Sequence, residues 1–181
     1  IIRIADAKAA RSYFTPATGK LTLKKGCDAR TVFHESGHLF DYALRAGPIG
    51  NGTWTSARFK AGGTTFGDEL LRDYGELLAS RGLGAGKDRE LAAAIRAELA
   101  GAPPRATVEL SDILSGCSSG AAHLGFGHSR AYWARSPDNL PIEAFANMFS
   151  AASTSAEAYA ALSRYFPRGA KMFETMIGAI R

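Results

Sequence analysis

The pentapeptide His34-Glu35-Ser36-Gly37-His38 constrains the fold and the chemistry of this chain more than any other segment. On an α-helix, which turns about 100° per residue, His34 and His38 lie one turn apart on nearly the same face, with Glu35 about 60° from His38. Two imidazoles placed in this way bind zinc together with a third protein ligand, and the fourth position is left to a water whose pKa the metal lowers. The sequence therefore predicts a Zn²⁺ site with Glu35 as the general base that takes the proton of that water.

The residues around the pentapeptide predict a helix packed on a core. Asp28 is expected to cap the start of this helix, and Gly47-Pro48 to end it. Four residues recur at the three- and four-residue spacing of a buried helical face: Phe33, Gly37, Phe40 and Leu44.

A neighbouring row on the same helix consists of His34, His38 and Asp41, and we expect it to face a cleft. Asp41 is predicted to accept the free ring N–H of a ligand histidine, which would fix the tautomer of that ring. The alternative for Asp41 is an ordinary surface charge. The alternative for the histidines is an amphipathic helix whose two partly buried rings make ordinary hydrogen bonds.

The composition is typical of one globular domain over residues 1–181, with 46% hydrophobic and 22% charged residues. The net charge of +5 comes from basic residues scattered along the chain, so nucleic-acid binding is not expected. No apolar stretch approaches the roughly 20 residues that a membrane span requires. The chain begins with Ile1-Ile2 and lacks a signal-peptide pattern, so we expect it to be part of a longer or processed chain.

The two cysteines, Cys27 and Cys117, allow either one disulfide or two unpaired thiols. The sequence does not choose between them.

The rest of the chain predicts an α+β fold that is mainly helical with a small N-terminal sheet. Residues 11–25 are expected to form a hairpin ahead of the metal-binding helix, with Gly19 to Lys24 as the strand that could accept an extended peptide. Residues 47–67 and 115–127 are rich in glycine and small polar residues and predict loops. Six further helices are expected near residues 67–81, 87–100, 107–115, 140–152, 155–165 and 168–180.

The third metal ligand is not part of the pentapeptide. An extended zinc motif with a third histidine would need His at position 44, where the chain has Leu44, so that class is excluded. The acidic candidates include Glu69, Glu76, Glu109 and Glu143. Glu143 is favoured because it lies in a strongly apolar helix, where a carboxylate is costly unless it is paired or metal-bound. Its alternative role is a glutamate stabilised by the dipole at a helix N-terminus, whereas Glu69 and Glu76 are expected to face solvent.

Taken together, these segments resemble zincin-like metallopeptidase domains of the gluzincin (HExxH) type. The resemblance is to domains of tailed-phage head-morphogenesis (minor head) proteins and, more distantly, to the lethal-factor-like peptidase domains of bacterial toxins. It implies a zincin-like fold, zinc held by His34, His38 and Glu143, and Glu35 as general base. The segments that carry it are His34-Glu35-x-x-His38-x-x-Asp41, Gly127-His128-Ser129-Arg130-Ala131-Tyr132-Trp133, Glu143-Ala144-Phe145-Ala146, Tyr13-Phe14-Thr15-Pro16 and Tyr165-Phe166-Pro167.

Zincin-like enzymes commonly add a Tyr or His that donates to the oxyanion, and in lethal-factor-like enzymes this is a tyrosine shortly before the third ligand. Here Ser136 stands seven residues before Glu143, so Tyr132 or His128 is the candidate donor. For His128 the alternative is a loop histidine that anchors the backbone. For Tyr132 and its neighbour Trp133 the alternative is packing in the core.

The resemblance predicts a peptidase that acts on a protein or peptide substrate, in the bacterial cytoplasm or a phage virion. One alternative is a non-catalytic zinc domain with a structural or docking role in a virion. Another is a secreted or delivered toxin or effector protease, with the same chemistry and a different partner. The sequence does not assign the oligomeric state.

Overall fold

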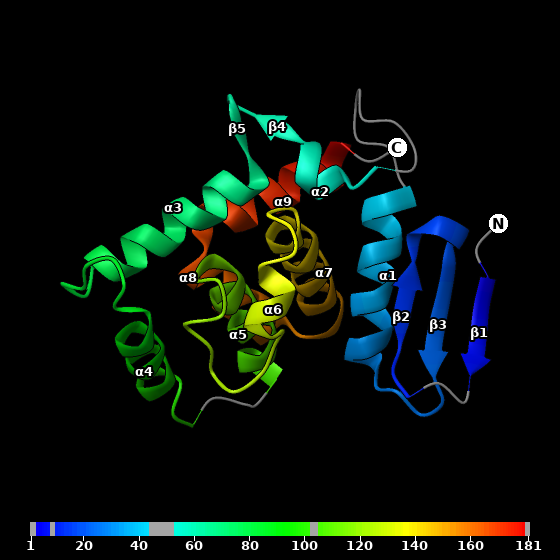
Figure 1. Ribbon diagram of the computed structural model, residues 1–181, viewed down its shortest axis with the longest axis horizontal. Helices are drawn as coiled ribbons and strands as arrows, with labels where there is room; N and C mark the ends of the chain where they lie inside the picture. The colour runs from blue at the N-terminus through cyan, green and yellow to red at the C-terminus, as the bar shows by residue number, and fades with distance from the viewer. Residues whose placement is uncertain (1–2, 8–9, 44–52, 102–104, 180–181) are drawn as a thin grey trace.

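The computed structural model describes residues 3–7, 10–43, 53–101 and 105–179. Within them the chain is mainly helical and carries a three-stranded sheet and a two-stranded hairpin (Figure 1). This confirms the coarse α+β class. Leu44, which we expected in the buried row of the predicted metal-binding helix, and Gly47-Pro48, which we expected to end that helix, lie outside the described residues. None of the described helices has the length and apolarity needed to cross a membrane.

The sheet consists of β1 (Arg3–Ala7), β2 (Tyr13–Thr15) and β3 (Lys20–Lys24), in the order β1-β3-β2. The predicted hairpin is confirmed, because β2 and β3 pair antiparallel around the 3-10 turn Pro16–Thr18. The parallel pairing of β1 with β3 was not predicted. It makes β3 the central strand, so the prediction that Gly19 to Lys24 accepts a peptide is wrong: its backbone groups are already paired on both sides. The edge strand next to the helix that carries the pentapeptide is β2 (Figure 1).

The helix predicted to bind the metal is α1 (Ala29–Ala43), and its predicted cap is confirmed because the Asp28 Oδ1 accepts the Thr31 backbone N–H at 2.8 Å. The segment predicted as a loop up to residue 67 contains α2 (Thr55–Arg58) and the hairpin of β4 (Lys60–Ala61) and β5 (Thr64–Thr65). A short helix, α6 (Arg130–Trp133), follows the second predicted loop. The six expected helices are α3 (Phe66–Ala79), α4 (Asp88–Glu98), α5 (Arg105–Cys117), α7 (Asn139–Thr154), α8 (Ala156–Tyr165) and α9 (Pro167–Ala179).

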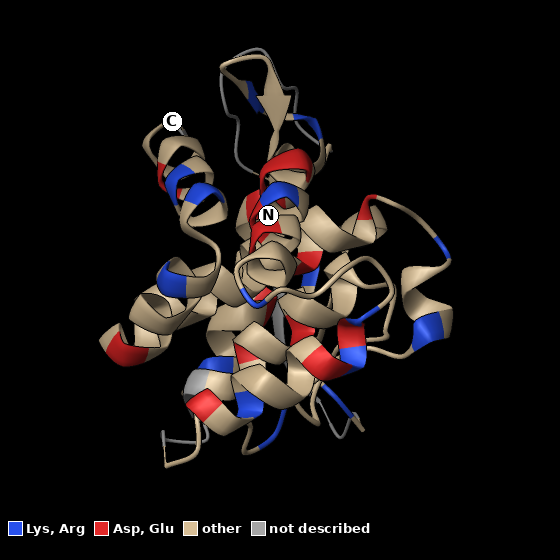
Figure 2. Cartoon of the chain, turned by 90° about the vertical axis from the view of Figure 1, so that its left-hand side faces the viewer, with Lys and Arg blue, Asp and Glu red and all other residues tan. Residues whose placement is uncertain are grey.

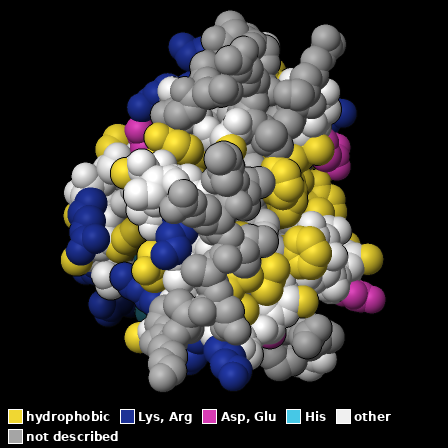
Figure 3. All heavy atoms as spheres, turned by 90° about the vertical axis from the view of Figure 1, so that its right-hand side faces the viewer, with side chains coloured by type: hydrophobic (Ala, Val, Ile, Leu, Met, Phe, Trp, Pro, Cys, Tyr) yellow, Lys and Arg dark blue, Asp and Glu magenta, His cyan; other side chains and the backbone are white. Residues whose placement is uncertain are grey.

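Helix α7 is the centre of the molecule. It packs against α1, α3, α5, α8 and α9, and it contributes the fully buried Phe145 and Met148 to the core. On one side of α7 lie α1 and then the sheet, which contacts α1 through β2 and β3 (Figure 1). Seen from the side of the sheet, the surface carries hydrophobic side chains next to Lys and Arg, and few acidic ones (Figure 3).

Helices α1 and α7 cross closely at Gly37. A Cβ at this position would lie 2.8 Å from the Cα of Ala146 and 3.2 Å from the Cβ of Phe149. The buried face of α1 is centred on this contact, and the expectation of a buried row through Phe33 and Phe40 is therefore wrong in part. Both rings remain 36% exposed at the margins of the contact.

We expect Gly37→Ala to lower the free energy of unfolding by about 1–3 kcal/mol, because the added methyl group would clash with the backbone of α7. Urea-induced unfolding followed by circular dichroism measures the change. Gly75→Ala in α3 is the matched control, since a Cβ there meets no atom within 4 Å. It should stabilise the chain by about 0.5–1 kcal/mol through helix propensity. Equal effects of the two substitutions would contradict the close helix contact.

Candidate metal centre

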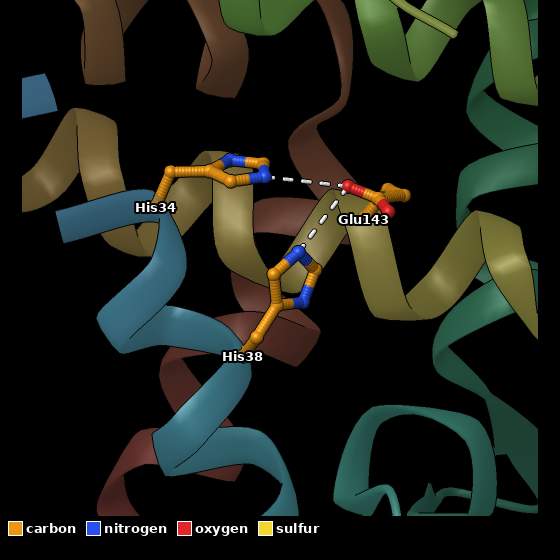
Figure 4. A group of neighbouring side chains, drawn as sticks. All are labelled: His34, His38 and Glu143. Atoms are coloured by element: carbon orange, nitrogen blue, oxygen red, sulfur yellow. Dashed lines mark ion pairs between the residues drawn. The ribbon is translucent and has the colours of Figure 1, made fainter. Parts of the chain in front are cut away.

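The side chains of His34, His38 and Glu143 converge from two helices that are distant in sequence (Figure 4). The Nε2 atoms of His34 and His38 each lie 3.4 Å from the same carboxylate oxygen, Oε2 of Glu143. The two rings come from successive turns of α1, with centroids 4.8 Å apart. Glu143 comes from the second turn of α7, one turn before the Ala146 that contacts Gly37.

The geometry of these three donors fits a tetrahedral divalent metal. Two ligand atoms about 2.05 Å from such a metal lie about 3.3 Å from each other, close to the 3.4 Å found here. The Oε2 atom of Glu143 is buried and accepts no hydrogen bond. A buried carboxylate oxygen without a partner is costly, and a metal ion would satisfy it. Side chains that could hold a metal ion are thus present where we predicted them.

The electrostatics of the cluster keep Glu143 ionised. Burial raises the pKa of its carboxyl group, but the charges of His38 and His34 outweigh burial and hold the pKa well below its ordinary value. Burial lowers the pKa of His38, but the carboxylate of Glu143 more than compensates and raises it. An ionised carboxylate is the form that coordinates metal.

The other acidic candidates do not reach the imidazoles. Glu69 pairs with Arg72 at 3.0 Å, and it is 9% exposed rather than facing solvent as expected. Glu76 pairs with Arg168. Glu109 is buried beside Arg30.

The centre lies in a cleft of about 420 Å³ between α1, α7 and β2. Glu35, the predicted general base, lines this cleft and also a second hollow of about 260 Å³. The apolar part of the cleft wall comes from Tyr13, Phe14, Pro16, Trp54 and Ile142. Glu35 is thus placed beside both histidines, at the point where the two hollows meet.

Both candidate hydrogen-bond donors lie at the same centre. The hydroxyl group of Tyr132 donates to Oε1 of Glu143, the oxygen that does not face the histidines. The Nε2 of His128 lies 3.8 Å from the same Oε1, and its ring stacks on Tyr132 with centroids 4.0 Å apart. Core packing, the alternative role for Tyr132 and Trp133, applies to Trp133. Its ring is buried, and its Nε1–H donates to Ser115 Oγ at 2.9 Å.

Asp112 is a site residue that the sequence analysis missed. Its carboxylate accepts the backbone N–H of His128 at 2.8 Å and the amide of Asn147 at 3.0 Å, and it holds the His128 Nδ1 at 3.1 Å. Gly127 permits this approach, with a φ of 114° and a Cβ position only 2.5 Å from Asp112 Oδ1. Asp112 therefore orients the Nε2 of His128 towards Glu143. Asp112, His128 and Glu143 form a second group that could hold a metal, but the carboxylate of Asp112 is already occupied by three donors.

The predicted role of Asp41 is wrong. Asp41 is fully buried, and its two oxygens accept the backbone N–H of Ser56 at 2.7 Å and the Ser56 hydroxyl at 2.6 Å. Burial raises the pKa of its carboxyl group to about 7. The Nδ1 atoms of His34 and His38 are buried, and neither donates to Asp41. Asp41 thus ties α1 to α2, because both of its oxygens are committed to that helix.

The two cysteines are unpaired, which settles the alternative left open by the sequence. The thiol of Cys117 donates to the Leu70 carbonyl at 3.8 Å. Neither thiol belongs to a metal-ligand group of the described residues.

We expect the purified chain to bind one Zn²⁺ and Glu143→Gln to weaken zinc binding by more than about 100-fold, the upper range for loss of an outer-shell partner. Competition with a chromophoric chelator measures the affinity. The control Glu69→Gln removes a carboxylate that does not reach the imidazoles and should leave the zinc affinity unchanged. Asp112→Asn should change it by less than about threefold if the ion sits between the histidines of α1. Wild-type affinity in Glu143→Gln would refute this ligand assignment.

Comparisons of the chain with known protein families, with curated proteins and with solved structures find no match.

Proposed function

We propose that the chain is a zinc-dependent endopeptidase with a zincin-like fold, in which His34, His38 and Glu143 hold the metal and Glu35 is the general base. The observation that carries this proposal is the convergence of two imidazoles and a buried, unpartnered carboxylate oxygen beside Glu35 in an open cleft. A purely structural zinc site needs neither an adjacent free carboxylate nor access from solvent.

Zinc in such a site supplies Lewis acidity, which polarises a peptide carbonyl and lowers the pKa of a water molecule. Glu35 accepts the proton of the attacking water and delivers it to the leaving amine. Its presence in the lining of both hollows supports this role, because Glu35 is accessible from either side. The other carboxylates that line the two hollows have different roles, because Glu143 faces the imidazoles and accepts from Tyr132, and Asp112 accepts from His128 and Asn147.

Tyr132 and His128 are suited to stabilise the oxyanion that develops on the substrate carbonyl. Burial and the charge of Glu143 raise the pKa of Tyr132, so its hydroxyl group keeps the proton that it would donate. Burial lowers the pKa of His128, but Asp112 and Glu143 raise it by more. With Nδ1 held by Asp112, the proton available for donation is on Nε2.

The substrate chain is expected to lie along β2. This strand is an edge of the sheet, and residues from Arg11 to Phe14 line the cleft beside the metal centre. An extended peptide added to this edge would gain main-chain hydrogen bonds that do not depend on its sequence. The substrate of the proposed reaction is therefore an extended segment of protein.

Glu35→Gln should slow peptide hydrolysis by at least about 100-fold, because the general base is lost. The zinc-loaded chain would be assayed with casein and with a degenerate internally quenched peptide library. Zinc content and circular dichroism should stay at wild-type values. Glu174→Gln on the exposed face of α9 is the matched control and should retain full activity. If the zinc-loaded wild type cleaves nothing, the non-catalytic alternative of a structural or docking domain replaces this proposal.

Asp112→Asn should lower kcat by about 10- to 100-fold with little change in KM, because Asp112 acts by positioning His128. His128→Ala should lower kcat at least as much. The double variant should be no slower than His128→Ala alone, because the two residues act as one unit. Steady-state kinetics with one quenched peptide tests this, and additive losses would show that Asp112 acts independently of His128.

A further inference from the structure

A third hollow, of about 520 Å³, shares Gly127 and His128 with the second hollow and His128 with the cleft. Basic and acidic residues are intermixed over the molecule as a whole (Figure 2). The lining of this hollow is different, because it contains no carboxylate. Its charged or titratable side chains are those of Arg89, His123, His128 and Arg130.

The two arginines come from different elements. Arg89 belongs to the first turn of α4, and Arg130 begins α6. The side-chain stem of Arg130 packs against Gly120, where a Cβ would come within 2.5 Å of the Arg130 Cγ. Arg96 belongs to α4, and its guanidinium donates to the His123 carbonyl at 3.0 Å. This hydrogen bond ties the loop between α5 and α6 to α4. Contacts of the loop with Arg130 of α6 and with Arg96 of α4 therefore define two sides of the hollow.

Within the described part of the chain, neither Arg89 nor Arg130 has an ion-pair partner. The acidic residues on either side of Arg89 in sequence have other partners, since Asp88 accepts the Tyr74 hydroxyl at 2.6 Å and Glu90 pairs with Lys87 at 2.9 Å. Other arginines at the surface are paired at close range, as Arg58 is with Asp138 and Arg81 is with Glu98, both at 2.7 Å. The hollow is thus lined by two guanidinium groups that have no ion-pair partner among the described residues, and it shares His128 with the catalytic cleft.

We propose that this hollow binds an acidic side chain of the substrate, on the side of the scissile bond that passes His128. This inference rests on the proposed peptidase function and adds a substrate class to it. Guanidinium groups form charge-assisted, often bidentate hydrogen bonds with carboxylates. The net charge of +5 would also steer an acidic segment towards the cleft.

Four sets of internally quenched peptides test the proposal with the zinc-loaded chain. Each set has a degenerate centre and carries Asp-Glu-Asp or its uncharged twin Asn-Gln-Asn on the N-terminal or the C-terminal flank. We expect the acidic set for one flank to be cleaved with a kcat/KM about fivefold or more above its twin, through a lower KM. The double variant Arg89→Gln/Arg130→Gln should abolish this ratio, and 0.5 M NaCl should reduce it, because salt screens exposed charges. The control Arg164→Gln/Lys171→Gln removes the same number of charges from α8 and α9 and should retain the ratio.

Equal cleavage of acidic and uncharged twins by the wild type would overturn this inference and leave the peptidase function intact. Loss of the ratio in the control double variant as well would also overturn it, since general charge would then be the cause. If no set is cleaved, the peptidase proposal fails, and fluorescence anisotropy decides the inference separately. A fluorescein-labelled acidic peptide should then bind the zinc-loaded Glu35→Gln chain about fivefold more tightly than it binds the same chain with Arg89→Gln/Arg130→Gln. Equal binding of the acidic peptide by the two chains would overturn the proposal that the hollow binds acidic side chains.

Discussion

The close crossing of α1 and α7 at Gly37 is the contact on which the site depends. Glu143 reaches His34 and His38 only because the two helix backbones approach more closely than any side chain at position 37 would allow. The glycine inside the pentapeptide is thus as necessary to the centre as the histidines that flank it. Gly37 has no reactive side chain. It contributes by allowing α1 and α7 to approach closely enough for Glu143 to reach the histidines.

Helix α7 organises the rest of the centre as well. Glu143 and Asn147 lie one turn apart on its buried face, and Asn147 donates to the Asp112 that holds His128. Burying this polar row would be unfavourable if its groups were unpaired. Each member has a partner except the Oε2 of Glu143, the atom that faces the imidazoles. The one unsatisfied oxygen of the row is therefore at the place where a cation would sit.

The local parts of the site could be predicted from sequence because helical spacing fixes them. His34, Glu35 and His38 share one helix, and the apolar surroundings of Glu143 distinguished it from the other acidic residues. Asp112 was missed because its role depends on a contact between a helix and a glycine-rich loop 15 residues further on, which no local pattern encodes. Asp41 was assigned wrongly for the same reason, since its true partner Ser56 lies on α2, beyond the end of α1.

The topology of the sheet was likewise only half predictable. The hairpin of β2 and β3 is local and has a clear turn signal in Pro16 and Gly19. The parallel partner β1 is joined to β3 through β2, so its pairing is set by the packing of the whole sheet and not by a turn. That pairing decides which strand is an edge, and so moves the expected peptide-binding strand from β3 to β2.

The candidate donor Tyr132 and the candidate metal ligand Glu143 are both tied to α7, although they come from different segments. Tyr132 lies on the short helix α6, whose neighbouring Trp133 is anchored to α5 through Ser115. The backbone carbonyl of Tyr132 accepts the side-chain amide of Asn139, the first residue of α7. The hydroxyl of Tyr132 then meets Glu143 on the same helix. Because α7 fixes both ends of this tyrosine, a shift of α7 would move the metal ligand and the hydrogen-bond donor together, and their relative geometry would be preserved.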